Sequence, residues 1–200
     1  MAYALVIIVS YLLGSIPFGL LLTKAAGLGD IRAIGSGNIG ATNVLRTGNK
    51  KLAALTLFLD GAKGAAAVLL VEYLNPELVA LAGLFALLGH LFPVWLKFKG
   101  GKGVATTVGV ITALLWPLGI LTMVVWMLVA WRFRYSSLAA LVAIGMAPFG
   151  AYTIGARNLV WPLTVMALLV FWKHGANIKR LLDGTEPKIG QGKDAAPRAE

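Results

Sequence analysis

Long apolar runs, separated by short polar, glycine-rich or basic stretches, constrain this 200-residue chain more than any other feature. An α-helix needs roughly 20 apolar residues to cross the hydrocarbon core of a bilayer. Hydrophobic residues make up 58% of the chain and charged residues 13%, which leaves too little polar surface to cover a water-soluble domain. The sequence therefore predicts an all-α integral membrane protein, with spans at Ala2–Thr23, Leu52–Leu74, Leu78–Leu96, Gly103–Leu115, Leu118–Trp131, Leu138–Ile154 and Leu159–Trp172.

The stretch from Gly103 to Trp131 decides the number of spans, because it could cross the membrane once or twice. Its 29 residues would form about 43 Å of straight helix, and Trp116-Pro117 interrupts it in the middle. Two crossings place 16 of the 18 lysines and arginines on one side, as the positive-inside rule requires, whereas one crossing would divide them between both sides. We therefore expect seven transmembrane helices, several of them short, with the N-terminus outside and the C-terminus cytoplasmic.

The same reasoning gives one polytopic membrane domain over residues 1–182 and a polar, frayed cytoplasmic tail over 183–200. The absence of cysteine excludes disulfides, thiolate zinc sites and iron–sulfur clusters, and two histidines are too few for a histidine-rich metal site. We expect no metal and no cofactor. The net charge of +10 is explained by the basic cytoplasmic loops, so the expected environment is a lipid bilayer and we expect no nucleic-acid partner.

The segment from Ile34 to Arg46 is the richest in possible ligands. It matches G-x-G-x-x-G at Gly35, Gly37 and Gly40, but no strand pattern precedes it, so a nucleotide-binding fold is excluded. Glycines still allow backbone N–H groups to converge on a phosphate. Further donors come from Ser36, Asn38, Thr42, Asn43 and Arg46. We interpret the segment as a phosphate site, and the alternative is a flexible connector.

A second basic segment, Lys97–Thr107, combines three lysines and three glycines where a helix is expected to begin. A helix N-terminus and lysine charge together favour an anion site, although an ordinary positive-inside loop would have a similar composition. Lys102, between Gly101 and Gly103, is the best single candidate, and Thr106 follows on the expected helix.

His174 and Asn177 stand three residues apart, on one face of a helix, at the end of the last span. A histidine there is either a helix cap or a catalyst. His90 is interpreted as a structural hydrogen-bonding residue. Asp60 and Lys63, inside the second span, are interpreted as a buried ion pair, with a substrate-cavity wall as the alternative.

Six motifs, taken in order, closely resemble those of the bacterial acyl-phosphate:glycerol-3-phosphate acyltransferases, from about residue 5 to residue 182. They are Gly14–Pro17, Gly35–Asn43, Asp60–Gly64, Gly100–Thr106, Arg134–Leu138 and His174-x-x-Asn177. The resemblance implies an enzyme of the bacterial inner membrane, active on its cytoplasmic side. It would move a fatty acyl group from acyl phosphate to the 1-hydroxyl of glycerol 3-phosphate, which is the first step of phospholipid synthesis, and release lysophosphatidic acid and phosphate. A soluble enzyme that forms acyl phosphate is a candidate partner.

Carried over onto this chain, the resemblance assigns Lys102, His174 and Arg46 as catalytic residues. Substrate binding is assigned to Ser36, Gly37, Asn38, Gly40, Thr42, Asn43, Gly101, Gly103, Thr106, Ser137 and Asn177. The hydroxyl would attack directly, without an acyl-enzyme, and its proton would pass to His174 or to an oxygen of the substrate phosphate. A transporter of a lipid precursor or organophosphate is the alternative, which predicts inverted repeats and a site near the midplane.

Overall fold

A computed structural model describes residues 1–190, and every regular element in that part of the chain is helical. The longer helices are α1 (Ala2–Gly14), α4 (Lys50–Leu74), α5 (Val79–Leu91), α6 (Val104–Leu114), α7 (Trp116–Phe133), α8 (Ser136–Thr153) and α9 (Arg157–Lys173). The shorter ones are α2 (Phe18–Ala25), α3 (Ala41–Val44), α10 (Gly175–Leu182), and the 3-10 turns η1 (Ile31–Ala33), η2 (Leu45–Thr47), η3 (Pro76–Leu78) and η4 (Val94–Leu96). The all-α prediction is confirmed for the described residues.

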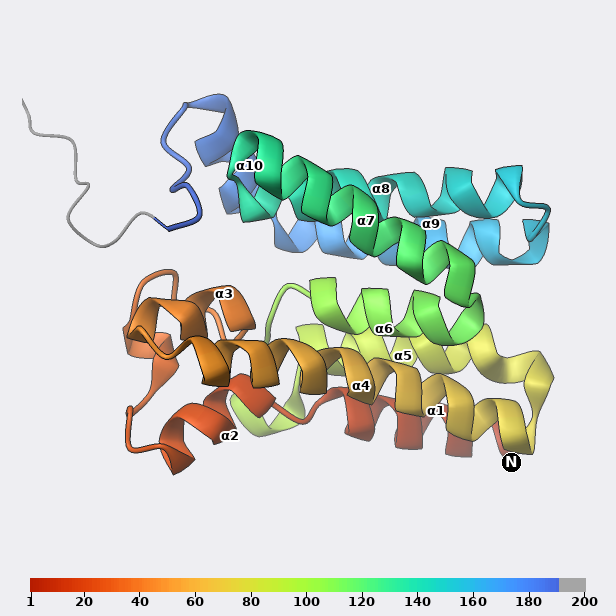
Figure 1. Ribbon diagram of the computed structural model, residues 1–200. Coiled ribbons are helices and arrows are strands. Elements are labelled where there is room, and N and C mark those ends of the chain that lie inside the picture. Colours follow the sequence, from red (N-terminus) through yellow and green to blue (C-terminus); the bar gives the residue numbers. More distant parts are fainter. Residues whose placement is uncertain (191–200) are drawn as a thin grey trace, which may run out of the picture.

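The long helices form two layers (Figure 1). In one layer α4 packs against α5 and α6, and α1 packs against α5; in the other α8 packs against α7 and α9. Fully buried side chains from both layers meet in one apolar core, among them Leu87, Ile111, Leu118, Ile144 and Met166. The short helices α2, α3 and α10 gather at the end of the molecule opposite the N-terminus.

Five apolar helical stretches are long enough to cross a membrane, namely Ala2–Ala25, Lys50–Leu74, Pro76–Leu96, Trp116–Phe133 and Ser136–Thr153. A sixth is reached if α9 and α10, which meet at 65°, are counted as one broken span. Helix α6 has 11 residues, about half the length that a hydrocarbon core requires. Five or six stretches therefore meet the length criterion, and the count of seven crossings stays a prediction.

The chain breaks at the predicted place in the stretch from Gly103 to Trp131. Helix α6 ends at Leu114, and α7 begins at Trp116 with Pro117 in its first turn, where the missing N–H of proline costs no helical hydrogen bond. The two helices lie beside one another and carry the chain from the first layer into the second.

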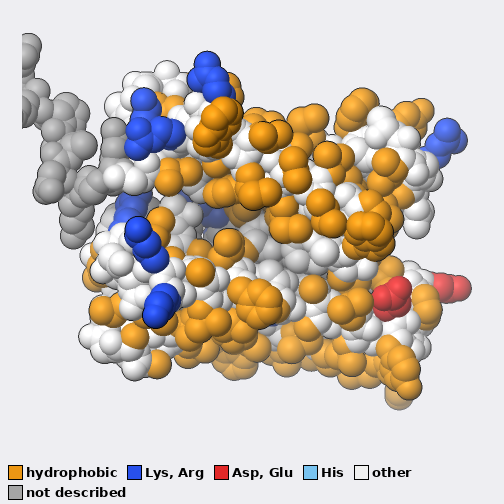
Figure 2. Space-filling model, in the orientation of Figure 1, with side chains coloured by type: hydrophobic (Ala, Val, Ile, Leu, Met, Phe, Trp, Pro, Cys, Tyr) orange, Lys and Arg blue, Asp and Glu red, His pale blue; other side chains and the backbone are white. Residues whose placement is uncertain are grey.

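The basic segments meet at the end that holds α2, α3 and α10. Figure 2 shows most of the visible lysine and arginine side chains at this end and acidic side chains at the opposite end. Hydrogen bonds join segments far apart in the sequence there: Lys173 Nζ donates to the Leu91 carbonyl over 3.2 Å, and Arg134 donates to the Ile189 carbonyl over 3.1 Å. The basic segments that hold most of the predicted site residues thus meet at one end of the molecule.

Candidate functional site

A polar network at the basic end connects the two layers. Lys102, in the loop before α6, donates to Asn177 Oδ1 of α10 over 2.5 Å. The amide nitrogen of Asn177 donates to Glu186 Oε1 over 2.6 Å, and Ser137 of α8 donates to the same oxygen over 2.6 Å. Arg180 donates to Glu186 Oε2 over 2.7 Å. Three predicted residues, Lys102, Ser137 and Asn177, are thereby brought together from three separate segments.

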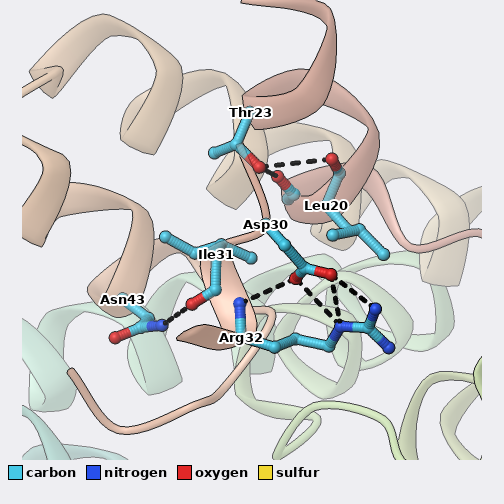
Figure 3. Close-up of polar contacts among 7 residues, drawn as sticks. Leu20, Thr23, Asp30, Ile31, Arg32 and Asn43 are labelled. Carbon is cyan, nitrogen blue, oxygen red and sulfur yellow. Dashed lines mark hydrogen bonds and ion pairs between the residues drawn. The ribbon is translucent and has the colours of Figure 1, made fainter. Parts of the chain in front are cut away.

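The loop from Ile34 to Arg46 is organised around Asn43, which is 2% exposed. Its amide nitrogen donates to the carbonyls of Ile31, Ile34 and Asn38 over 2.8–3.0 Å, and its Oδ1 accepts from the backbone N–H of Ser36 over 3.2 Å. Figure 3 shows the bond from Asn43 to Ile31. Because these contacts engage both ends of the amide within the loop, Asn43 acts here as the organiser of the loop.

Asp30 and Arg32 fix the entry to this loop (Figure 3). Asp30 Oδ1 accepts from the backbone N–H of Arg32 over 2.9 Å, and the two side chains form an ion pair. The hydrogen bonds from the Arg32 side chain hold the pKa of Asp30 well below its usual range. Both arginines are exposed, but the Arg32 guanidinium is occupied by a carboxylate, whereas Arg46 forms no ion pair with the described residues.

The Arg46 side chain lies directly over Gly35. A Cβ atom added at Gly35 would stand only 2.5 Å from Arg46 Nη1. Ser36, Gly37 and Thr42 of the same loop are exposed, and Asn38 turns back to accept from the N–H of Gly40 over 3.0 Å.

The Ile34–Arg46 loop reaches the second layer through one hydroxyl contact. The Thr42 hydroxyl lies 3.4 Å from that of Ser136, at the start of α8 and next to Ser137. The exposed donors of the loop thus border the Lys102–Asn177–Glu186 network.

Burial lowers the pKa of Lys102 from 10.5 to about 8. The nearby charge of Glu186 raises that pKa, and Arg180 and Arg46 lower it, so both arginines lie close enough to act on the ammonium group. Lys102 is therefore a half-buried cation in a positively charged neighbourhood, the environment in which a cation gains most from an anionic ligand.

The glycines before Lys102 have a role in packing, in addition to any role in binding a ligand. The N–H groups of Gly100 and Gly101 donate to the carbonyls of Leu91 and His90, at the end of α5, over 3.2 and 3.0 Å. The backbone amide of Gly101 is thereby engaged within the protein, and Gly103 is buried directly before α6. Thr106 is fully buried against α4, where its backbone carbonyl approaches Gly64, and its hydroxyl makes no hydrogen bond to any described residue.

His174 caps the end of α9 and is 2% exposed. Its Nδ1 lies 2.8 Å from the Val170 carbonyl, which can only accept, so Nδ1 carries the proton and Nε2 has the free lone pair. Burial lowers the pKa of His174 to about 4, with a smaller contribution from the charge of Lys102. The imidazole is therefore neutral near pH 7, with Nε2 unprotonated.

Glu186 is the site residue that sequence reasoning missed. It lies in the segment that was expected to be a tail, yet it is 8% exposed and bonded to Ser137, Asn177 and Arg180. Burial alone would raise the pKa of Glu186, but these three hydrogen bonds lower it below its ordinary value. Residues 191–200 of the expected tail lie outside the described residues.

Replacing Glu186 with glutamine tests this role. The single oxygen of a glutamine amide cannot accept from all three donors, so Glu186→Gln should cost on the order of 2 kcal/mol of stability and release the amide of Asn177. We expect a lower melting temperature in detergent and weaker substrate binding. Asp183→Asn, which neutralises an exposed neighbouring carboxylate, is the matched control. Equal melting temperatures for the two variants would contradict a structural role for Glu186.

Known proteins resemble this chain over most of its length. The family model for glycerol-3-phosphate acyltransferase matches residues 4–184. The glycerol-3-phosphate acyltransferase of Mesorhizobium japonicum is 60% identical over 192 residues, which cover 95% of this chain and 98% of the relative. That of Brucella canis is 56% identical over 184 residues, which cover 92% of each chain.

The fold is shared with solved structures of PlsY (YgiH), an integral membrane glycerol 3-phosphate acyltransferase. Its glycerol 3-phosphate form superposes with a TM-score of 0.90 at 38% identity, over 95% of this chain and 96% of that one. Its lysophosphatidic acid form gives a TM-score of 0.89 at 36% identity over the same shares. The resemblance seen in the sequence motifs is thereby confirmed, and this chain belongs to the glycerol-3-phosphate acyltransferase family.

Proposed function

We propose that this chain transfers a fatty acyl group from acyl phosphate to the 1-hydroxyl of glycerol 3-phosphate, and so forms 1-acyl-glycerol 3-phosphate and phosphate. The observation that carries the proposal is the half-buried Lys102 between the exposed loop of Arg46 and the His174–Asn177 pair, at the end of a bundle of apolar helices. Anionic phosphate groups and an apolar chain can meet at such a boundary. The names of the related proteins support glycerol 3-phosphate as the acceptor.

Lys102, Arg46 and Ser36 are proposed to hold the phosphate of the donor. Positive charge and hydrogen-bond donors there would also stabilise the oxyanion of the tetrahedral intermediate. Ser137, His174 and Asn177 are proposed to orient glycerol 3-phosphate. The oxygen of its hydroxyl bonds to the acyl carbon, the bond from that carbon to the bridging oxygen breaks, and phosphate leaves with the bridging oxygen.

The proton of the attacking hydroxyl needs an acceptor within hydrogen-bond reach. Nε2 of His174 is available, because Nδ1 is engaged with Val170. A non-bridging oxygen of the donor phosphate is the other acceptor. Direct attack suffices in either case, since acyl phosphate is already an activated donor.

The site is proposed to face the cytoplasm of a bacterial inner membrane, with seven spans and the N-terminus outside. The positive-inside rule supports this orientation, because the basic loops lie at one end of the molecule. A soluble enzyme that forms acyl phosphate would supply the donor from the same side. Labelling of single cysteines placed at residues 116–119 and at Lys99 tests the arrangement, since the two sites should react from opposite sides of the membrane.

An assay with the purified protein in detergent tests the donor. Acyl phosphate and glycerol 3-phosphate, with no added metal, should give equal amounts of phosphate and lysophosphatidic acid. Acyl-CoA and the thioester of acyl carrier protein should give no product under the same conditions. A thioester that serves as well as acyl phosphate, or a requirement for a divalent ion, would contradict the proposal.

The pKa of Lys102 predicts the pH dependence. Its pKa of about 8 means that the ammonium form, which the phosphate needs, is present below pH 8 and is lost as pH rises. We expect kcat/KM to fall by about tenfold per pH unit above that value. In Lys102→Arg the guanidinium stays charged, so whatever activity remains should not fall between pH 8 and 9.5. An alkaline decrease of the same size in both proteins would exclude Lys102 as its source.

A further inference from the structure

A buried polar cluster in the first layer lies behind the loop that carries Lys102. Lys63 Nζ is 2.7 Å from Asp60 Oδ1, and both side chains, on α4, are at most 4% exposed. Lys63 also donates over 2.7 Å to the carbonyl of Ile16, at the break between α1 and α2 where Pro17 interrupts the helix. The interpretation of Asp60 and Lys63 as a buried ion pair is confirmed. His90, on α5, completes the cluster with Nδ1 3.7 Å from Asp60 Oδ1.

His90 is the member of this cluster that lies next to the loop of Lys102. Asp60 and Lys63 form an ion pair, and Lys63 also donates to the interrupted helix, whereas Asp60 Oδ1 and His90 Nδ1 make no hydrogen bond to a described residue. The His90 side chain is 4% exposed, and its Nδ1 makes no hydrogen bond to any residue that the structure describes. A buried polar group without a partner costs about 1–3 kcal/mol, so an apolar residue of similar size would suit a purely structural position better.

The opposite edge of the His90 ring supports the loop. A Cβ at Gly101 would stand 2.0 Å from His90 Nε2, and the three heavy atoms nearest to it all belong to the His90 ring. The carbonyl of His90 also accepts from the Gly101 N–H over 3.0 Å. His90 therefore contacts Gly101 through both backbone and side chain, and the next residue is Lys102.

We propose that His90, held in place beside the Asp60–Lys63 pair, is a positioning residue for Lys102. The inference rests on the proposed role of Lys102 in phosphate binding. The contacts between His90 and Gly101 hold the backbone of the loop in place next to Lys102. The ammonium group of Lys102 is therefore held at one position relative to Asn177. An error of about 1 Å in the position of a catalytic group can lower the rate by about 100-fold, so a rigid support for the Lys102 loop would raise the rate.

A double-mutant cycle tests the contact. Gly101 does not have a positive φ, so alanine can adopt its backbone conformation, and the nearest atoms to the new methyl group are those of His90. Gly101→Ala should therefore displace the loop and lower kcat/KM by about 100-fold. In the His90→Ala background the ring is gone, and adding Gly101→Ala should change kcat/KM by less than about threefold.

Two further measurements separate positioning from loss of fold. His90→Ala alone should lower kcat/KM more than Val71→Ala, a buried substitution in a separate apolar cluster, when the two variants have equal melting temperatures. Asp60→Asn combined with Lys63→Met should show the same kinetic defect as His90→Ala, since it removes the pair beside the ring. If Gly101→Ala does not fold, recovery of folded protein in the His90→Ala background supports the contact equally well.

Two results would overturn the proposal. The first is a Gly101→Ala defect in kcat/KM that has the same size with and without the His90 ring. The second is a kcat/KM of His90→Ala no lower than that of Val71→Ala. Those outcomes leave the proposed function intact. Absence of product from acyl phosphate and glycerol 3-phosphate with the unmodified protein would instead contradict the proposed function, so failure of the two proposals can be told apart.

Discussion

Replacing Lys102 with methionine is expected to lower kcat by about 10³-fold, the largest effect of any single substitution considered for this protein. Methionine keeps the length and flexibility of the side chain and removes its charge. The substitution also removes the donor to Asn177 and the half-buried cation that is proposed to hold the phosphate. Phosphate release measured in detergent, at saturating acyl phosphate and glycerol 3-phosphate, gives the change in turnover directly.

Lys99→Met is the matched control, because Lys99 belongs to the same basic loop and is exposed. Exposed charges contribute little, so this variant should keep nearly the full activity of the parent. Equal losses in both variants would mean that the loop acts only through its general positive charge. In that case no phosphate-binding role could be assigned to Lys102 in particular.

Replacing His174 with alanine is expected to lower kcat by about 100-fold, the usual contribution of a positioned general base. Nε2 would be lost as the proton acceptor, while Ser137, Asn177 and Lys102 would remain to bind substrate. KM for glycerol 3-phosphate should therefore change less than kcat. An increase in KM with unchanged turnover would dismiss His174 as the base and favour an oxygen of the substrate phosphate.

The cap at the end of α9 needs its own control, since His174 Nδ1 donates to the Val170 carbonyl. Asparagine can donate to that carbonyl through its amide and has no basic nitrogen. His174→Asn should therefore preserve more of the melting temperature than His174→Ala and show the same loss of turnover. Full turnover in the asparagine variant would show that the cap is the only function of His174.

The helical architecture could be predicted from the sequence because it depends on local properties. Long apolar runs give the helices, and Trp116-Pro117 gives the break between α6 and α7. The positive-inside rule predicted that the basic loops share one side, and they lie at one end of the molecule. The number of crossings could not be settled in this way, because the 11 residues of α6 are too few to span a bilayer on length alone.

The site was predictable only in part, for a different reason. Lys102, Ser137 and Asn177 were identified from their motifs, but their hydrogen bonds to one another join segments far apart in the chain. Glu186 follows Gly184 in a polar stretch whose composition is typical of a frayed terminus, and only tertiary contacts give it a role. Gly101 belongs to the predicted anion site of the second basic segment, and its close approach to His90 is visible only in three dimensions.

The division of the site between two layers has a consequence for biosynthesis. Lys102 and its partner Asn177 are 75 residues apart, and Glu186 is made later still. A chain emerging from the ribosome can insert all the helices of the first layer and still lack Asn177 and Glu186, two members of the polar network. A partial chain that stops before α10 therefore lacks the residue that accepts from Lys102.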